Sequence, residues 1–558
     1  MPEIKKYIKR YYPYAVFAAI TFAIMLPFFF QEGFLFLLDM VWGPNILPSE
    51  YFYDGGTSSY PLMLLINIFS LFLPREYLQK ILLALVLYLC GHLMFKLSRD
   101  IMPRRWATLS GIFYILNPYV FERFLAGQWI VLLGYAIFPL VVFRFTTFLK
   151  SDRRKDLWFF VVLFSAYPLI SLHWAYISFW FLSLMGGIYL IQIIGTAKSK
   201  KQDLTTLRKK FISFAILQLV IWLTINFFWL KDFWNADGVI SKITQNDFQA
   251  FSTTADSTWG TFFNVLSLYG FWQDSFFLPK DFFSGWWVLT FIIIVFSAFG
   301  FYDLAKKRNS LALTLGVAFV PTVLIAAGYG DTLTRPLTDF LFQILPGFAG
   351  LRETAKVVGI LAFTYALFFP LGVRLLIDRL YRNTKNRNRE IIYTCSAVLF
   401  ILSCCLLVNN IFSGFNGQVR AWPYPDSWYK VKETLDSEPG TRKVLFLPWH
   451  RYLEIAFANN VRADNPASAF FGAEIISGEN LDSLYLADKS QGEWDERISE
   501  MVKGEKCLDD NFDFLKAQKV EYIILAKTDD WQMYSFLDKS WSVRKIFEEN
   551  EIALYEIL

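Results

Sequence analysis

The segment MLPFFFQEGFLFLLDMVWGPN (residues 25–45) joins the end of an apolar run to a short stretch that contains Asp39. The apolar run, residues 12–30, has the length that a helix needs to cross about 30 Å of hydrocarbon. Asp39 lies nine residues past the end of that run. The sequence therefore predicts a carboxylate at a membrane surface.

Composition extends this interpretation to most of the chain. Hydrophobic residues make up 55% of the sequence and aromatic residues 19%, which is more than soluble globular proteins carry. Apolar stretches of spanning length recur, and we predict about eleven spans. They cover residues 12–30, 78–97, 106–118, 128–148, 157–173, 174–193, 211–230, 285–304, 310–328, 356–376 and 391–412. Pro168 lacks a backbone N–H, so a turn or break is expected between the fifth and sixth.

The basic residues predict an orientation. Lys and Arg gather in alternate loops, around residues 5–10, 96–105, 150–155, 198–210, 306–308 and 374–389. Cytoplasmic loops carry such an excess, so the N-terminus is predicted to be cytoplasmic. An odd number of spans then places the tail outside the plasma membrane. Topology accounts for the positive charge, and no nucleic-acid partner is expected.

Two regions follow from these assignments. Residues 1–412 form a membrane domain with large outer loops at 31–77, 231–284 and 329–355. Residues 413–558 form an extracytoplasmic α/β domain of ordinary domain size. Its strands are predicted at RKVLFLPW (442–449) and VEYIILAK (520–527), with a helix over 510–518 and a closing hairpin around Glu549. In the first outer loop, PLMLLINIFSLFLP (61–74) is too short to span and predicts an interfacial or re-entrant helix.

Three features resemble the C-type (GT-C) membrane glycosyltransferases, which take sugars from polyprenyl-phosphate donors. They are Asp39 in a large first outer loop, NPYVFERFLAGQW (117–129) with adjacent Glu122 and Arg123, and LPGFAGLRETAKV (345–357). The chain is similar to arabinofuranosyltransferase-like proteins and to multispan proteins of lipopolysaccharide or teichoic-acid glycosylation. Many members pair two acidic residues in the first outer loop, whereas Asp39 has no acidic neighbour.

The resemblance implies that Asp39 is the catalytic base. Glycosyl transfer needs a group that accepts the proton of the acceptor hydroxyl, and a carboxylate can do so. Asp54, Glu122 and Glu32 are alternative catalytic residues. The other interpretation of Asp39 is a solvated interfacial carboxylate or a helix cap.

The departing phosphate needs positive charge, and basic residues are scarce in the outer loops. Arg352 and Lys356 are four residues apart and are predicted to share one helix face at the start of a span. Arg123 and Arg335 are further candidates for phosphate binding, because a guanidinium matches a phosphate with two parallel hydrogen bonds. Local pairing is the alternative, of Arg352 with Glu353 or another carboxylate and of Arg123 with Glu122.

Contacts with the acceptor or the sugar are expected from His173, Trp259 and Trp272, although packing at the membrane interface explains them equally. No His/Cys cluster has the spacing of a metal site, so no metal-binding residue is assigned. Mg²⁺ or Mn²⁺ remains compatible with the chemistry implied by the resemblance, and no cofactor is required by the sequence.

The sequence thus predicts a transferase whose partners are the lipid bilayer, a polyprenyl-phosphate sugar and a glycan, lipid or protein acceptor. Two alternatives stay open. One is a flippase or transporter of lipid-linked sugars, against which the chain shows no internal repeat and few charges at mid-membrane depth. The other is a non-catalytic scaffold that keeps the fold, since fold does not determine activity.

Overall fold

The computed structural model describes residues 2–45, 58–151, 153–200, 205–233, 243–273, 275–382, 386–437, 442–478, 493–503, 508–528 and 530–558. Two compact units form. Unit 1 contains residues 1–25, 83–124 and 129–416, and unit 2 contains residues 26–82, 125–128 and 417–558. The predicted C-terminal domain, 413–558, supplies the larger part of unit 2, and the first outer loop folds with it.

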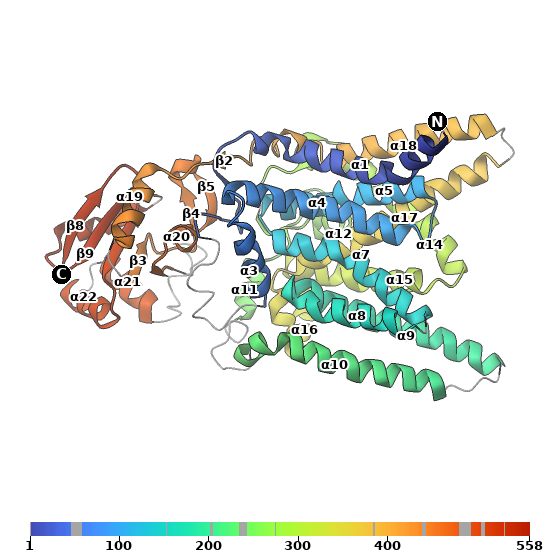
Figure 1. Ribbon diagram of the computed structural model, residues 1–558, viewed down its shortest axis with the longest axis horizontal. Coiled ribbons are helices and arrows are strands. Elements are labelled where there is room, and N and C mark those ends of the chain that lie inside the picture. The colour runs from blue at the N-terminus through green and yellow to red at the C-terminus, as the bar shows by residue number, and fades with distance from the viewer. Residues whose placement is uncertain are drawn as a thin grey trace. The chain divides into compact units, whose positions relative to one another are not determined.

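Long apolar helices run side by side in unit 1 (Figure 1). Among the described residues, nine helices of the chain are long and apolar enough to cross a membrane. They are α1 (Pro2–Phe29), α4 (Arg75–Ser98), α7 (Trp129–Lys150), α9 (Leu172–Lys200), α10 (Thr205–Phe233), α14 (Trp286–Lys306), α15 (Ser310–Ala327), α17 (Val358–Leu380) and α18 (Asn386–Leu407). The protein is a polytopic helical membrane protein.

The other two predicted spans, 106–118 and 157–173, correspond to shorter helices. They are α5 (Arg104–Ile115), of 12 residues, and α8 (Arg154–Ala166), of 13 residues. The break expected at Pro168 is confirmed, because the 3₁₀ turn Tyr167–Leu169 separates α8 from α9.

Helix α17 forms the centre of unit 1. Every residue from Val358 to Gly372 is buried, and α5 and α14 pack against this helix. Glycines allow the close approach to α14: a Cβ at Gly372 would overlap the carbonyl oxygen of Phe296. Small residues at such contacts are how membrane helices pack closely. Helix α17 therefore gives the residues at its N-terminal end a rigid support.

Shorter helices of unit 1 lie in the predicted outer loops 231–284 and 329–355 and in the segment 117–129. They are α6 (Pro118–Leu125), α11 (Gln245–Ala250), α12 (Gly260–Leu266), α13 (Pro279–Phe282) and α16 (Arg335–Ile344). Between α16 and α17 the chain forms two 3₁₀ turns, Phe348–Leu351 and Thr354–Val357. The exact limits of the outer loops stay a prediction.

Unit 2 contains a five-stranded sheet with helices on both faces. The strand order is β6 (Glu474–Ile476), β3 (Lys443–Leu447), β7 (Tyr522–Ala526), β9 (Ile552–Ile557) and β8 (Val543–Glu548). Strand β3 runs parallel to β6 and β7, while β9 is antiparallel to β7 and β8. The predicted strands and the closing hairpin are confirmed.

Side chains of β3 alternate between two cores. Leu445 and Leu447 pack with α21 (Glu493–Lys503) and α22 (Leu508–Ala517), while Phe446 faces Trp428 on α19 (Asp426–Asp436). This alternation is the period of two that a strand imposes. The predicted helix over 510–518 corresponds to α22.

The first outer loop contributes three elements to unit 2. Strand β1 (Phe34–Leu35) pairs with β2 (Ala421–Trp422), beyond the end of α18 in sequence. Helix α3 (Tyr60–Phe69) confirms the predicted short helix, and its Leu65 and Phe69 are half exposed. A third element, the turn at Leu37–Met40, carries Asp39. That α3 lies along a bilayer stays a prediction.

Candidate active site

Helix α6 positions adjacent charged residues in unit 1. Asn117 starts the helix, because its side-chain oxygen accepts the backbone N–H of Val120 at 3.2 Å, and Pro118 follows. Glu122 and Arg123, in the next turn, are 2% and 1% exposed. Buried charges of this kind are retained only with partners, and the two side chains find different ones.

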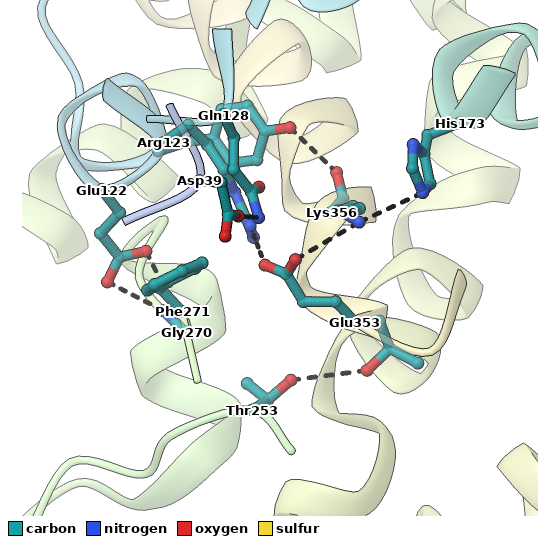
Figure 2. A network of polar contacts seen from close by, with 12 residues as sticks. Asp39, Glu122, Arg123, Gln128, His173, Thr253, Gly270, Phe271, Glu353 and Lys356 are labelled. Carbon is teal, nitrogen blue, oxygen red and sulfur yellow. Dashed lines mark hydrogen bonds and ion pairs between the residues drawn. The ribbon is translucent and has the colours of Figure 1, made fainter. Parts of the chain in front are cut away.

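Glu122 anchors the second outer loop. Its carboxylate accepts the backbone N–H groups of Gly270 at 3.3 Å and Phe271 at 3.2 Å (Figure 2). Burial raises the pKa of Glu122 to about 7, although Arg123 and the two backbone donors act in the opposite direction. A role for Glu122 as the alternative catalytic residue stays a prediction.

Glu353 joins two of the predicted phosphate-binding residues. One of its oxygens forms an ion pair with Arg123, and the other lies 3.4 Å from Nζ of Lys356 (Figure 2). The guanidinium of Arg123 also lies over the Phe271 ring, 5.0 Å from its centre. Lys356 is 8% exposed, and Tyr119 donates to its carbonyl oxygen at 3.2 Å. The cations are therefore held in a buried, ordered network.

His173 completes this network, which we call the cation cluster: Arg123, His173, Glu353 and Lys356. Nε2 of His173 lies 3.2 Å from Nζ of Lys356. Because a lysine ammonium has donors and no acceptor, this nitrogen must accept, which requires a neutral imidazole. The structure thus brings together three predicted residues from three separate segments.

The cation cluster lies at the N-terminal end of α17. Lys356 belongs to the 3₁₀ turn that leads directly into this 23-residue helix. The hydroxyls of Thr253 and Thr354, which are 3.5 Å apart, connect that turn to the second outer loop. Helix N-termini carry partial positive charge, so this position adds to the attraction that Lys356 and Arg123 exert on an anion.

Arg352 points to a different carboxylate. Its guanidinium is 3.8 Å from Asp247 and lies over the Phe251 ring at 4.6 Å. Phe251 also contacts Trp272, with ring centres 5.1 Å apart. The prediction that Arg352 and Lys356 share a helix face is wrong, because 3₁₀ turns replace the α-helix there.

Two further candidates of unit 1, one for phosphate binding and one for sugar contact, are not part of the cation cluster. Arg335 is at the start of α16, and its Nε donates to the carbonyl oxygen of Tyr329 at 3.2 Å. Trp259 is 40% exposed and packs on Trp287, with ring centres 5.5 Å apart. Their contacts with phosphate and sugar stay predictions.

Asp39 belongs to unit 2, where two side chains donate to its carboxylate. Nε2 of Gln128 lies 2.9 Å from Oδ2, and the hydroxyl of Tyr452 lies 2.7 Å from Oδ1. Asp39 is only partly buried, and each of its oxygens keeps a further lone pair for an incoming group. Glu32 is exposed, and Asp54 lies outside the described residues.

The described residues contain no group of three His, Cys, Asp or Glu side chains that could hold a metal ion. No chemical step is assigned to a metal.

No protein-family model matches the chain, and no curated protein sequence matches it. Solved structures match the chain. The arabinofuranosyltransferase AftD from Mycobacteria superposes with a TM-score of 0.59 and 11% identity over 98% of this chain. This chain has the GT-C fold. It covers 40% of the AftD chain, and at this identity the likeness is one of fold alone.

Two other solved structures match with lower scores. The oligosaccharyltransferase AglB from Archaeoglobus fulgidus, in complex with an inhibitory peptide and a dolichol-phosphate, gives a TM-score of 0.43 at 13% identity, covering 93% of this chain and 69% of that one. ArnT from Cupriavidus metallidurans gives 0.45 at 11% identity, covering 97% of both chains.

Within this GT-C fold, the structure adds three residues that sequence reasoning did not select. Glu353 and Gln128 lie inside motifs already singled out, and Glu353 is three residues from Lys356, but Gln128 is 89 residues from Asp39 along the chain. Tyr452 is 413 residues from Asp39 along the chain, and no local pattern links the two.

Proposed function

We propose that the protein is a membrane glycosyltransferase that moves one sugar from a polyprenyl-monophosphate donor to an acceptor hydroxyl at the outer face of the plasma membrane. The observation that carries the proposal is the cation cluster, which holds Arg123 and Lys356 buried at the start of α17 in a GT-C fold. Cations in a water-poor site stabilise a developing phosphate charge far more than they do in water.

The proposed reaction assigns a role to each group. Asp39 accepts the proton of the acceptor hydroxyl, and the hydroxyl oxygen forms a bond with C1 of the donor sugar. The bond between C1 and the phosphate oxygen breaks, and the polyprenyl monophosphate leaves with the bonding electron pair. Lys356 and Arg123 stabilise the charge that develops on the phosphate, and Arg352 assists in donor binding.

The orientation is also a proposal. The loops rich in Lys and Arg are cytoplasmic by the positive-inside rule, and the helices of spanning length among the described residues number nine, which is odd. The N-terminus is then cytoplasmic and the C-terminal domain extracytoplasmic, where an envelope glycan, lipid or protein would supply the acceptor hydroxyl.

Turnover in liposomes tests this proposal. The purified protein is reconstituted with polyprenyl monophosphates that carry radiolabelled pentoses or hexoses, and with envelope extract as acceptor. We expect wild-type protein to release polyprenyl monophosphate. Asp39→Asn should reduce kcat by at least 100-fold with little change in donor KM, because the proton acceptor is lost.

Lys356→Met is the second variant in this liposome assay, because it keeps the length of the side chain and removes its charge. We expect a loss in kcat/KM of about 10- to 100-fold for the donor. Lys307→Met is the matched control, because Lys307 pairs with Asp303 on α14 at an exposed position and should leave turnover unchanged.

The same liposomes separate the alternatives. Movement of the intact donor across the bilayer, without release of polyprenyl monophosphate, would establish a flippase instead. Donor binding with neither turnover nor movement would indicate a scaffold that keeps the fold and lacks the chemistry.

A further inference from the structure

The carboxylate of Asp39 is held by one donor on each oxygen. Gln128, in the connection after α6, donates to Oδ2, and Tyr452, at the start of β4 (Tyr452–Ile455), donates to Oδ1. Tyr452 comes from the C-terminal domain and Gln128 from the chain between two membrane helices. Two donors on opposite oxygens fix both the direction and the rotation of a carboxylate.

The backbone around Asp39 is held from the same two sides. The N–H of Asp39 donates to the carbonyl oxygen of Ala126 at 2.8 Å, and Asp464 donates its N–H to the carbonyl oxygen of Leu38 at 2.8 Å. Gly127 has a φ of +71°, and a Cβ there would lie 2.7 Å from the backbone nitrogen of Met40. The turn that carries Asp39 is therefore clamped between residues 125–128 and a strand of the C-terminal domain.

The hairpin that supplies Tyr452 is held by strand pairing and ring contacts. Strand β4 pairs with β5 (Val461–Asp464), with Tyr452 opposite Asp464. Tyr452 is 8% exposed, and the guanidinium of Arg451 lies over its ring at 5.6 Å. Burial raises the pKa of Tyr452, and the charge of Asp39 raises it further, so the hydroxyl keeps its proton and remains a donor.

We propose that Tyr452 is a positioning residue for Asp39, so that the C-terminal domain is an integral part of the catalytic site. This inference rests on the proposed function, and it gives the domain a specific task beyond covering an acceptor. By donating to Oδ1, Tyr452 orients the Asp39 carboxylate toward the acceptor hydroxyl, and Gln128 holds Oδ2 of the same carboxylate.

Tyr452→Phe tests the inference, because it removes one oxygen atom and keeps the ring. In the liposome assay we expect kcat to fall roughly 10- to 100-fold while the donor KM stays within about twofold, since a misaimed base slows the chemical step and leaves donor binding intact. Unchanged kcat would overturn the inference.

Tyr424→Phe is the matched control. Tyr424 is 4% exposed in the same unit, and its hydroxyl donates to the carbonyl oxygen of Trp42 at 3.0 Å, in the loop that also contains Asp39. This variant should lower the melting temperature as much as Tyr452→Phe does and leave kcat unchanged. Equal losses of kcat in both variants would mean that Tyr452 acts only through stability, which would also overturn the inference.

A thermal double-mutant cycle gives a readout that needs no turnover. Asp39→Ala and Tyr452→Phe should together lower the melting temperature by less than the sum of their separate effects, because both remove the same hydrogen bond. Additive effects would overturn the positioning role even if the transferase is active. Coupling in a protein without turnover would overturn the proposed function, and with it the task assigned to Tyr452.

Discussion

Glu353 and Glu122 show how two carboxylates of one unit take different tasks. The carboxylate of Glu353 forms ion pairs with Arg123 and Lys356 and so holds both cations beside α17. The carboxylate of Glu122 accepts two backbone N–H groups and so anchors the second outer loop. Both are buried, and each depends on the groups that face it, because a buried charge without partners costs several kcal/mol.

The raised pKa of Glu122 gives a pH-dependent prediction. Between its ordinary value of 4.5 and about 7, the folded state binds a proton that the unfolded state has lost. The contribution of Glu122 to stability therefore falls as pH rises through this window, by on the order of 3 kcal/mol, and is constant above it.

Glu122→Gln has no titrating group and places an amide NH₂ against one of two backbone donors, which should cost about 1–3 kcal/mol. We expect the melting temperature of the wild-type protein minus that of this variant to decrease as pH rises through this window and to level off above it, measured by thermal unfolding in detergent. A difference that does not vary with pH would show that Glu122 does not titrate in this range.

At the scale of elements, much could be predicted because the signals are local. Nine of the eleven spans predicted from apolar length correspond to helices of spanning length among the described residues, and the short apolar runs predict β3 and β7. The interruption at Pro168 follows from its missing N–H. The start of α17 could not be predicted in the same way: Arg352 to Lys356 has helical spacing, but 3₁₀ turns direct the two side chains to Asp247 and Glu353.

The contact of α14 with α17 supports the cation cluster, and it can be tested. Gly372→Ala should destabilise the protein, because its Cβ would meet backbone atoms of α14 that cannot move aside. Gly187→Ala on α9 is the control, since a Cβ there meets nothing within 4 Å and alanine favours the helix. Thermal unfolding should show a lower melting temperature only for Gly372→Ala, and equal effects would contradict this packing.

At the scale of the whole molecule, the chain combines a helical bundle with a sheet-containing domain that incorporates the first outer loop. The sequence alone assigned Asp39 to the membrane region, because residues 31–77 lie between two spans. The pairing of β1 with β2 and the hydrogen bond from Tyr452 to Asp39 are seen only in the folded structure. Contacts between residues far apart in the chain leave no local pattern in a sequence.

A cryo-EM structure of the full chain with a long-chain polyprenyl monophosphate tests the central claim most directly. We predict phosphate density within hydrogen-bond distance of Lys356 or Arg123, with the carboxylate of Asp39 facing the phosphate across a space that admits a sugar. Phosphate density away from the cation cluster, or a carboxylate of Asp39 that faces away from it, would contradict the proposed transferase.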